Sequence, residues 1–156
     1  MDEEIERKFK FLPEKFKDTA VKKVFVIEQQ YILYSDGEEA RVRIKDDKAY
    51  LTIKSTQLGI TRKECNVEIS VDDAKHLMKM FGKGDKIKKI RSHAIYENRL
   101  WEIDEFKGVN EGLTIAEIEL ENEKSIINLP PWVGEEVTYD RRYRNSYIAE
   151  HPYSEW

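Results

Sequence analysis

The stretch Glu4-Ile5-Glu6-Arg7-Lys8 begins the chain with charged residues at every second position. In an extended strand, successive side chains point to opposite faces, so Glu4, Glu6 and Lys8 share one face while Ile5 and Arg7 share the other. Two carboxylates and an ammonium group on one strand face can hold a hard divalent cation beside an anionic ligand. The stretch alone does not establish such a site, but later strands repeat its pattern.

The size and composition of the chain limit what it can be. A chain of 156 residues is most simply one domain over residues 1–156, large enough to bury a core. It has no apolar run of roughly 18 residues, so we expect no membrane span. Its first residues lack the basic start and apolar stretch of a secretory signal, so we expect none. The lone Cys65 excludes an intramolecular disulfide and fits a reducing cytoplasm. The formal net charge of −4 gives no reason to expect a nucleic-acid partner.

Strand-like runs dominate the sequence. They are joined by turn signals such as Ser35-Asp36-Gly37, and their close spacing favours antiparallel hairpins over crossover connections. We expect strands over residues 4–11, 24–34, 39–45, 49–54, 61–69, 86–96, 99–106 and 113–121.

Helices are expected to be few. Ser70 followed by Asp73 resembles a capping box, and an apolar stripe then runs from Ala74 to Phe81 before Gly82 ends the helix. A second short helix is expected over residues 121–128, ahead of a pair of prolines, and a third over residues 140–150.

The charges on the expected strands are sorted by sign. Some strands carry bases on the face opposite their apolar residues, and others carry acids there. One interpretation is a half-buried antiparallel sheet with its charged face in water. However, solvated faces usually mix the two signs, and like charges at i and i+2 repel unless a counter-ion lies between them. Such pairs occur at Glu4/Glu6, Arg41/Arg43 and Glu117/Glu119.

A closed barrel with these charges in its lumen is the alternative interpretation. Closure also removes exposed strand edges. The enclosed side chains would carry a net charge of +2, and two divalent cations would raise it to +6, whereas a triphosphate carries roughly −4 to −5 near neutral pH. A small polyanion with metals matches this interior better than a sugar or an apolar ligand. The enclosed acids would be Glu4, Glu6, Asp104, Glu117 and Glu119, and the bases Lys8, Arg41, Arg43, Lys54, Arg62, Lys89 and Arg91.

Taken together, these motifs resemble the CYTH family, also called triphosphate tunnel metalloenzymes. Residues 4–8 resemble its ExExK signature, Arg41-Val42-Arg43 its RxR strand, and residues 51–54 its strand that ends in a phosphate-binding lysine. Residues 59–64 resemble its turn into an RxE strand. The resemblance covers nearly the whole chain and extends, in the family's order, to Lys89-Ile90-Arg91, Glu102-Ile103-Asp104, Glu117-Ile118-Glu119 and a stretch over residues 132–145 that is similar to short bacterial members.

The resemblance implies a mainly β (α+β) fold, a closed eight-stranded antiparallel barrel with a few helices packed on the outside. It implies two Mg²⁺ or Mn²⁺ ions per site, bound by Glu4, Glu6, Asp104, Glu117 and Glu119. One departure is Asn66, which stands where relatives often have a second acid and cannot supply negative charge. Phosphates would be bound by Lys8, Arg41, Arg43, Lys54, Arg62, Lys89, Arg91 and Arg142, the last closing the tunnel over its ligand.

The implied reaction is metal-dependent hydrolysis of a triphosphate, first of all inorganic tripolyphosphate, with water attacking the terminal phosphorus. Phosphoryl transfer needs positioning and charge neutralisation more than covalent catalysis. Metal ions can bridge phosphate oxygens and activate water, and Glu4 or Glu6 would orient that water as the catalytic carboxylate.

Two other functions remain open at this level. An adenylate cyclase of the same fold would need a pocket for the base, and a non-catalytic polyphosphate or nucleotide sensor would need bases but not five carboxylates. The expected partner is in each case a small-molecule phosphate compound. The aromatic residues near the C-terminus leave a homodimer contact as one hypothesis and packing of the last helix on its own barrel as the other.

Overall fold

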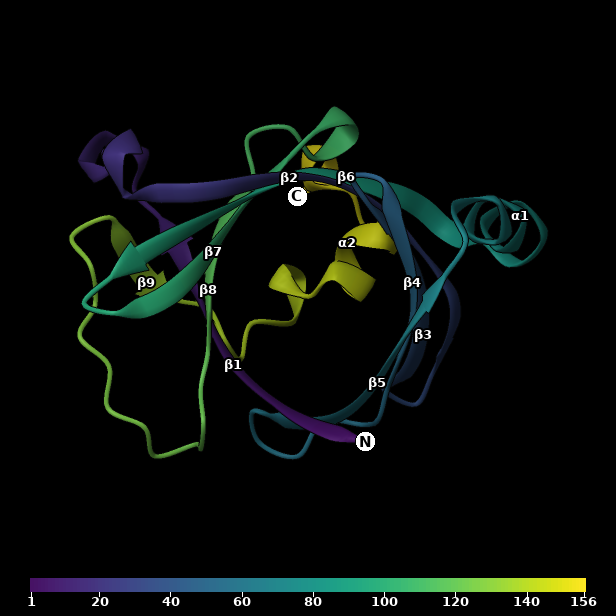
Figure 1. Ribbon diagram of the computed structural model, residues 1–156, viewed down its shortest axis with the longest axis horizontal. Helices are drawn as coiled ribbons and strands as arrows, with labels where there is room; N and C mark the ends of the chain where they lie inside the picture. Colours follow the sequence, from purple (N-terminus) through teal and green to yellow (C-terminus); the bar gives the residue numbers. More distant parts are fainter.

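The computed structural model describes residues 1–156, apart from the side chain of Thr19. The strands of this described chain are β1 (Asp2–Phe11), β2 (Val21–Ser35), β3 (Glu38–Lys45), β4 (Lys48–Lys54), β5 (Thr61–Ile69), β6 (Lys83–Tyr96), β7 (Arg99–Phe106), β8 (Thr114–Glu119) and β9 (Val133–Glu136). The ladders between these strands are antiparallel and form a closed ring (Figure 1). The order around the ring is β5-β4-β3-β2-β6-β7-β8-β1, and β1 pairs with β5 to close it.

The predicted eight-stranded barrel is therefore confirmed. Strand ends differ from the prediction by a few residues, since β2 and β6 begin earlier than expected. Strand β9 lies where no strand was predicted, and it pairs with the end of β1 beyond the ladder to β5. Its four residues are too few to show a period of two in the sequence.

Tight turns fix the register of two hairpins. The β2–β3 turn has Asp36 at φ 51° and Gly37 at φ 83°, and the β6–β7 turn has Glu97 at φ 48° and Asn98 at φ 63°. Positive φ at both central residues matches the right-handed twist of paired strands. Because a slip of one residue would turn every side chain to the opposite face, these turns keep the charged residues inside.

The outward faces of the strands are apolar and carry most of the core. On one side, helix α1 (Val71–Phe81) covers β3 and β4, with Ala74 and Met78 buried against Val42 and Ala49. The Ser70 side chain accepts a hydrogen bond of 3.0 Å from the amide of Asp73, so the predicted cap and helix are confirmed.

A second cluster covers the opposite side of the barrel. Phe9, Trp101 and Trp132 meet edge to face, with ring centroids 5.6 Å apart in both pairs that involve Trp101. Truncating a buried aromatic residue of this kind to alanine costs about 3–5 kcal/mol of stability. The two clusters leave the lumen as the place for the charged side chains.

The helix predicted over residues 121–128 is wrong. That segment forms turns and irregular structure in the described chain. Side chains of the segment bond to its own backbone: Asn122 accepts from the Lys124 amide at 2.9 Å, and Ser125 accepts from the Asn122 amide at 3.3 Å. Local bonds of this type compete with helix formation.

The helix predicted over residues 140–150 is broken into two pieces. A 3₁₀ turn, η4 (Arg141–Tyr143), precedes helix α2 (Asn145–Glu150), and Arg144 between them is extended at φ −78° and ψ 135°. The carboxylate of Asp140 caps η4 by accepting from the Arg142 amide at 3.1 Å. This break determines which arginine of the segment reaches the lumen.

Helix α2 lies within the outline of the ring (Figure 1). Its Ile148 and Ala149 pack with Ile87, Phe106 and Ile115. Each of these three residues lies two positions from a charged residue of its strand, and therefore on the same lumen face. One part of the lumen is thus apolar and filled by α2, and the charged part remains as a cavity. Among the helices of the described residues, the longest is α1 with 11 residues, and none has the length and apolar character needed to cross a membrane.

Candidate active site

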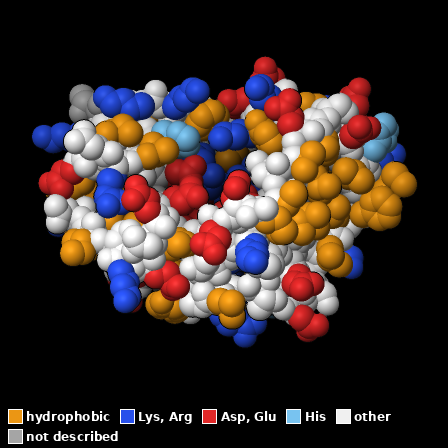
Figure 2. Space-filling view, turned by 60° about the horizontal axis from the view of Figure 1, so that its bottom comes forward, with side chains coloured by type: hydrophobic (Ala, Val, Ile, Leu, Met, Phe, Trp, Pro, Cys, Tyr) orange, Lys and Arg blue, Asp and Glu red, His pale blue; other side chains and the backbone are white. Residues whose placement is uncertain are grey.

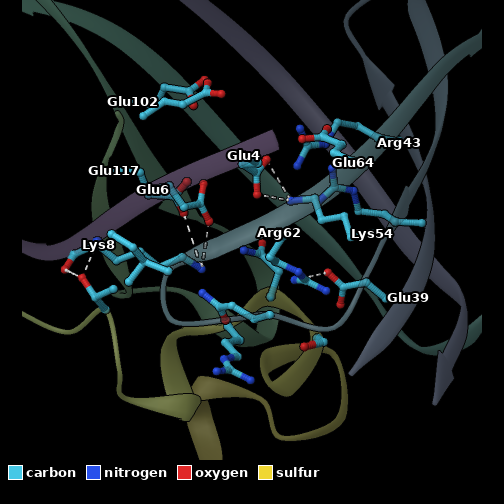
Figure 3. A pocket seen from close by; sticks show the side chains of 18 of the residues that line it. Glu4, Glu6, Lys8, Glu39, Arg43, Lys54, Arg62, Glu64, Glu102 and Glu117 are labelled. Carbon is cyan, nitrogen blue, oxygen red and sulfur yellow. Dashed lines mark hydrogen bonds and ion pairs between the residues drawn. The ribbon is translucent and has the colours of Figure 1, made fainter. Parts of the chain in front are cut away.

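The charged part of the lumen holds a cavity of about 210 Å³. Figure 2 shows acidic and basic side chains gathered around a hollow in one face of the molecule, and Figure 3 shows carboxylates and bases from different strands meeting across the cavity. Its walls consist of Glu4, Glu6, Lys8, Tyr31, Glu39, Arg41, Arg43, Lys54, Gln57, Ile60, Arg62, Glu64, Arg91, Glu102, Glu117, Glu119, Thr138, Arg144, Asn145 and Ser146.

The cavity brings together most of the residues predicted from the sequence. Lys89, Asp104 and Arg142 are the predicted site residues that do not line it. Three acids that were not assigned do line it, and alternation could have found them: Glu39 lies two residues before Arg41, Glu64 two after Arg62, and Glu102 two before Asp104. Because side chains of a strand alternate between its two faces, residues two positions apart lie on the same face.

Ion pairs cross the cavity between strands that are distant in sequence. The Lys54 ammonium lies 2.9 Å from a Glu4 carboxylate oxygen, and the Arg62 guanidinium lies 2.8 Å from Glu39 (Figure 3). Another ammonium, that of Lys8, lies 3.8–3.9 Å from oxygens of Glu6 and Glu117. These ion pairs connect the strands that form the walls. Other arginines and carboxylates of the cavity are less well paired.

One wall carries an excess of positive charge. Arg41 is 7% exposed, and its Nε has no hydrogen-bond partner within the described residues. Burial, and then the neighbouring Arg41 and Arg91, lower the pKa of Arg43 to about 9. A buried guanidinium beside a second one is costly unless an anion approaches it. The wall therefore suits a ligand with several negative oxygens.

The opposite wall carries crowded carboxylates. In the ladder between β1 and β8, Glu6 lies directly opposite Glu119, and Lys8 lies opposite Glu117. Burial, and then the charge of Glu6, raise the pKa of Glu117 to about 7. Burial, and then Glu4, Glu102 and Glu6, raise the pKa of Glu119. A divalent cation among these oxygens would relieve their mutual repulsion.

A family model described as the CYTH domain matches residues 2–148. The chain belongs to the CYTH family. It is 42% identical over 153 residues to the inorganic triphosphatase of Acetivibrio thermocellus, covering 98% of this chain and 97% of that protein. To the inorganic triphosphatase of Nitrosomonas europaea it is 33% identical over 149 residues, covering 94% and 96%.

A solved structure agrees with the family assignment. The crystal structure of an inorganic triphosphatase superposes on this CYTH chain with a TM-score of 0.68 and 31% sequence identity, covering 96% of this chain and 95% of that one. The resemblance to the CYTH family inferred from the sequence motifs is thus confirmed, and so is the barrel that it implied.

The acids of this CYTH lumen fit a hard divalent cation in type and in charge. Carboxylate oxygens are the ligands that Mg²⁺ and Mn²⁺ prefer. Within the part of the chain that the structure describes, no group of three or more His, Cys, Asp and Glu residues is placed to hold a metal ion by itself. Mg²⁺ is commonly bound by one or two carboxylates together with substrate phosphates and water. The residues therefore fit a metal that is held jointly by protein and ligand.

Asp104 is buried behind the cavity wall and does not line the cavity. One of its oxygens accepts from Arg91 Nε at 2.7 Å, and the other accepts from Lys89 Nζ at 2.7 Å and from Arg91 at 2.8 Å. Both Asp104 and Lys89 are fully buried. Although burial alone would raise it, Arg91 and Lys89 hold the pKa of Asp104 well below its ordinary range. In this arrangement Asp104 fixes the side chain of Arg91, and a metal would have to displace both Arg91 and Lys89.

Arg142, which was expected to close the tunnel, points away from it. Its guanidinium pairs with Asp140 at 2.7 Å and lies over the rings of Tyr143 and Trp156, and its side chain is 54% exposed. Arg144 lines the cavity instead, because the extended residue between η4 and α2 turns the chain toward the lumen. The sequence contained no signal for this bend. Nearby aromatic residues pack on one another within the chain: Tyr143, Tyr147, Tyr153 and Trp156.

Mg²⁺ is expected to stabilise this protein by about 1 kcal/mol more at pH 8 than at pH 6. The folded-state pKa of Glu117, about 7, lies above its unfolded value near 4.5. In the metal-free protein, the stability contributed by protonated Glu117 is fully present below pH 4.5 and is lost as the pH rises through 7. A cation competes with that proton, so its binding gains as the carboxylate ionises.

Chemical unfolding with and without Mg²⁺ at both pH values measures this difference. The Glu117→Gln variant cannot ionise at that position, so most of the pH dependence should disappear from its metal-induced stabilisation. An equal stabilisation of the unaltered protein by Mg²⁺ at pH 6 and pH 8 would contradict the assignment of Glu117 as a metal ligand.

Proposed function

We propose that this chain is an inorganic triphosphatase that hydrolyses tripolyphosphate to pyrophosphate and phosphate in the lumen of its barrel. One observation carries the proposal: a single cavity sets the buried guanidinium group of Arg41 and the half-buried one of Arg43 against the crowded carboxylates of Glu6, Glu117 and Glu119. A metal–triphosphate complex would neutralise both walls at once. The names of the two curated CYTH relatives support the same activity.

The phosphate chain would lie along the basic wall. Arg41, Arg43 and Arg91 would donate hydrogen bonds to its oxygens, and guanidinium groups suit this task because they can bind phosphate oxygens in pairs. Lys8, Lys54 and Arg62 would contribute further positive charge. Each of these three is paired with a glutamate in the structure, so we expect the ligand to share or replace those partners.

The carboxylates would hold the cations and orient the attacking water. Two Mg²⁺ or Mn²⁺ ions, bound by Glu4, Glu6, Glu117 and Glu119, would neutralise phosphate charge and make water more acidic. Glu4 or Glu6 would orient a water toward the terminal phosphorus and take up its proton. The new bond joins the water oxygen to that phosphorus, the terminal anhydride bond breaks, and pyrophosphate carries away the bridging oxygen. The family resemblance implied that Asp104 binds a metal ion. We propose instead that Asp104 holds the Arg91 side chain in position for this step.

Tripolyphosphate with Mg²⁺ or Mn²⁺ is expected to release phosphate, and removal of the metal with a chelator is expected to stop the release. A phosphate-release panel over tripolyphosphate, thiamine triphosphate and nucleoside triphosphates, with Mg²⁺, Mn²⁺ and Ca²⁺, measures this. Formation of a cyclic nucleotide from ATP without phosphate release would assign the chain as a cyclase. Tight binding of tripolyphosphate without turnover would assign it as a sensor. We propose the reducing cytoplasm as its location, in keeping with the lone Cys65.

A further inference from the structure

Asn145 connects helix α2 to the wall of the barrel. It is the first residue of α2, and its side chain lines the cavity. Its carboxamide oxygen accepts two hydrogen bonds, one of 2.9 Å from Gln29 Nε2 on β2 and one of 3.1 Å from Lys89 Nζ on β6. One side-chain atom of the C-terminal segment thus contacts two neighbouring strands of the barrel.

Each of these contacts leads on to a phosphate-binding arginine. Gln29 is fully buried, and its carbonyl oxygen accepts a hydrogen bond of 2.8 Å from Arg43 Nε. Lys89 donates to Asp104 at 2.7 Å, and Asp104 in turn accepts from Arg91. The chain of contacts therefore runs from Arg43 through Gln29, Asn145, Lys89 and Asp104 to Arg91.

The amide of Gln29 can serve in this chain in one orientation only. Its oxygen must face Arg43, because a guanidinium donates and never accepts, and its NH₂ must then face the oxygen of Asn145. The oxygen of Asn145 must likewise face Lys89, because an ammonium has no acceptor. Donors and acceptors thus match along the whole chain, which leaves each buried group with a fixed place.

We propose that Asn145 and Gln29 are positioning residues, which set the guanidinium of Arg43 and, through Lys89 and Asp104, that of Arg91 for phosphate binding. This inference rests on the proposed function. Docking of α2 does not require these bonds, since Ile148 and Ala149 already bury apolar surface against the barrel. The polar chain instead couples the position of α2 to the geometry of the basic wall.

The test compares KM and kcat for tripolyphosphate in matched variants. Asn145→Leu removes the acceptor, and we expect KM to rise about tenfold with a smaller change in kcat. Gln29→Glu keeps an acceptor for Arg43 but loses the donor to Asn145, so we expect KM to rise in this variant as it does in Asn145→Leu. Asn145→Asp provides an oxygen that accepts both bonds, so we expect it to bring KM back to within about threefold of the unaltered protein.

Gln30→Met serves as the structural control. Gln30 is a buried glutamine on the same strand, but it donates to the Gly84 carbonyl oxygen at 3.0 Å and does not line the cavity. Its loss is expected to lower the melting temperature and to leave KM unchanged. If Asn145→Leu also leaves KM unchanged, or if Asn145→Asp behaves like Asn145→Leu, the positioning role is refuted.

The outcome for the unaltered protein separates this inference from the proposed function. Absence of turnover in the unaltered protein refutes the triphosphatase activity, and the same variants are then compared by calorimetric titration with tripolyphosphate. Weaker binding by Asn145→Leu, recovered in Asn145→Asp, would support the positioning role even then. Equal binding by all variants, or no binding to the unaltered protein, would refute it.

Discussion

Replacing Glu6 or Glu119 by alanine is expected to lower the rate of tripolyphosphate hydrolysis by about a thousandfold and to leave the barrel folded. The two residues face each other across the β1–β8 ladder, where two like charges repel. The charge of Glu6 also contributes to the raised pKa of Glu119. Losing one of them removes a proposed ligand of the cation and, at the same time, relieves repulsion in the metal-free protein. Activity and stability should therefore respond differently to the same substitution.

Glu3→Ala is the matched control for this experiment. Glu3 lies on β1 between the two predicted metal ligands of that strand, but it is exposed, faces outward and pairs in register with Lys63. Its hydrolysis rate is expected to remain within about twofold of the unaltered protein, since surface substitutions of this kind have small effects. Thermal unfolding measured on the same samples reports the fold. Full activity in both the Glu6 and the Glu119 variants would show that the metal ligands lie elsewhere.

The sequence predicted the lumen because strand geometry is simple. A period of two assigns Glu4, Arg41 and Glu117 to one face without knowledge of any partner strand. The same rule does not give depth along the barrel axis. Asp104 and Lys89 share the lumen face with residues of the cavity wall, yet they are fully buried and do not line the cavity, and Asn145 of α2 contacts Lys89 there. Depth depends on register and on what fills the lumen, and neither follows from one strand alone.

The C-terminal segment was the least predictable part of the site. Residues 140–150 have helical composition, but a single extended residue, Arg144, divides them and reaches the cavity. Asn145 carries no sequence signal for its contacts with Gln29 and Lys89, because these contacts join residues 116 and 56 positions apart. Local sequence propensity carries no information about such tertiary contacts. Prediction therefore succeeded for the eight strands of the barrel and failed where one polar side chain meets two distant strands.

The Arg41→Met variant is expected to bind tripolyphosphate about a hundredfold more weakly and to be about 1 kcal/mol more stable than the unaltered protein. Binding falls because a guanidinium donates strong, charge-assisted bonds to phosphate oxygens. Stability rises because Arg41 is buried, its Nε lacks a partner among the described residues, and its charge opposes that of Arg43. A methionine fills similar space without the cost of a buried charge.

Arg7→Met provides the contrast that separates function from burial. Arg7 also lies on a barrel strand, but its guanidinium is paired with Glu136 on the outer surface at 2.7 Å, away from the cavity. Its substitution is expected to lower stability slightly and to leave tripolyphosphate binding intact. Calorimetric titration and chemical unfolding of both variants measure the two quantities. A loss of stability in Arg41→Met, or an unchanged affinity for tripolyphosphate, would show that the Arg41 guanidinium is stabilised by other groups of the protein and does not bind the anion.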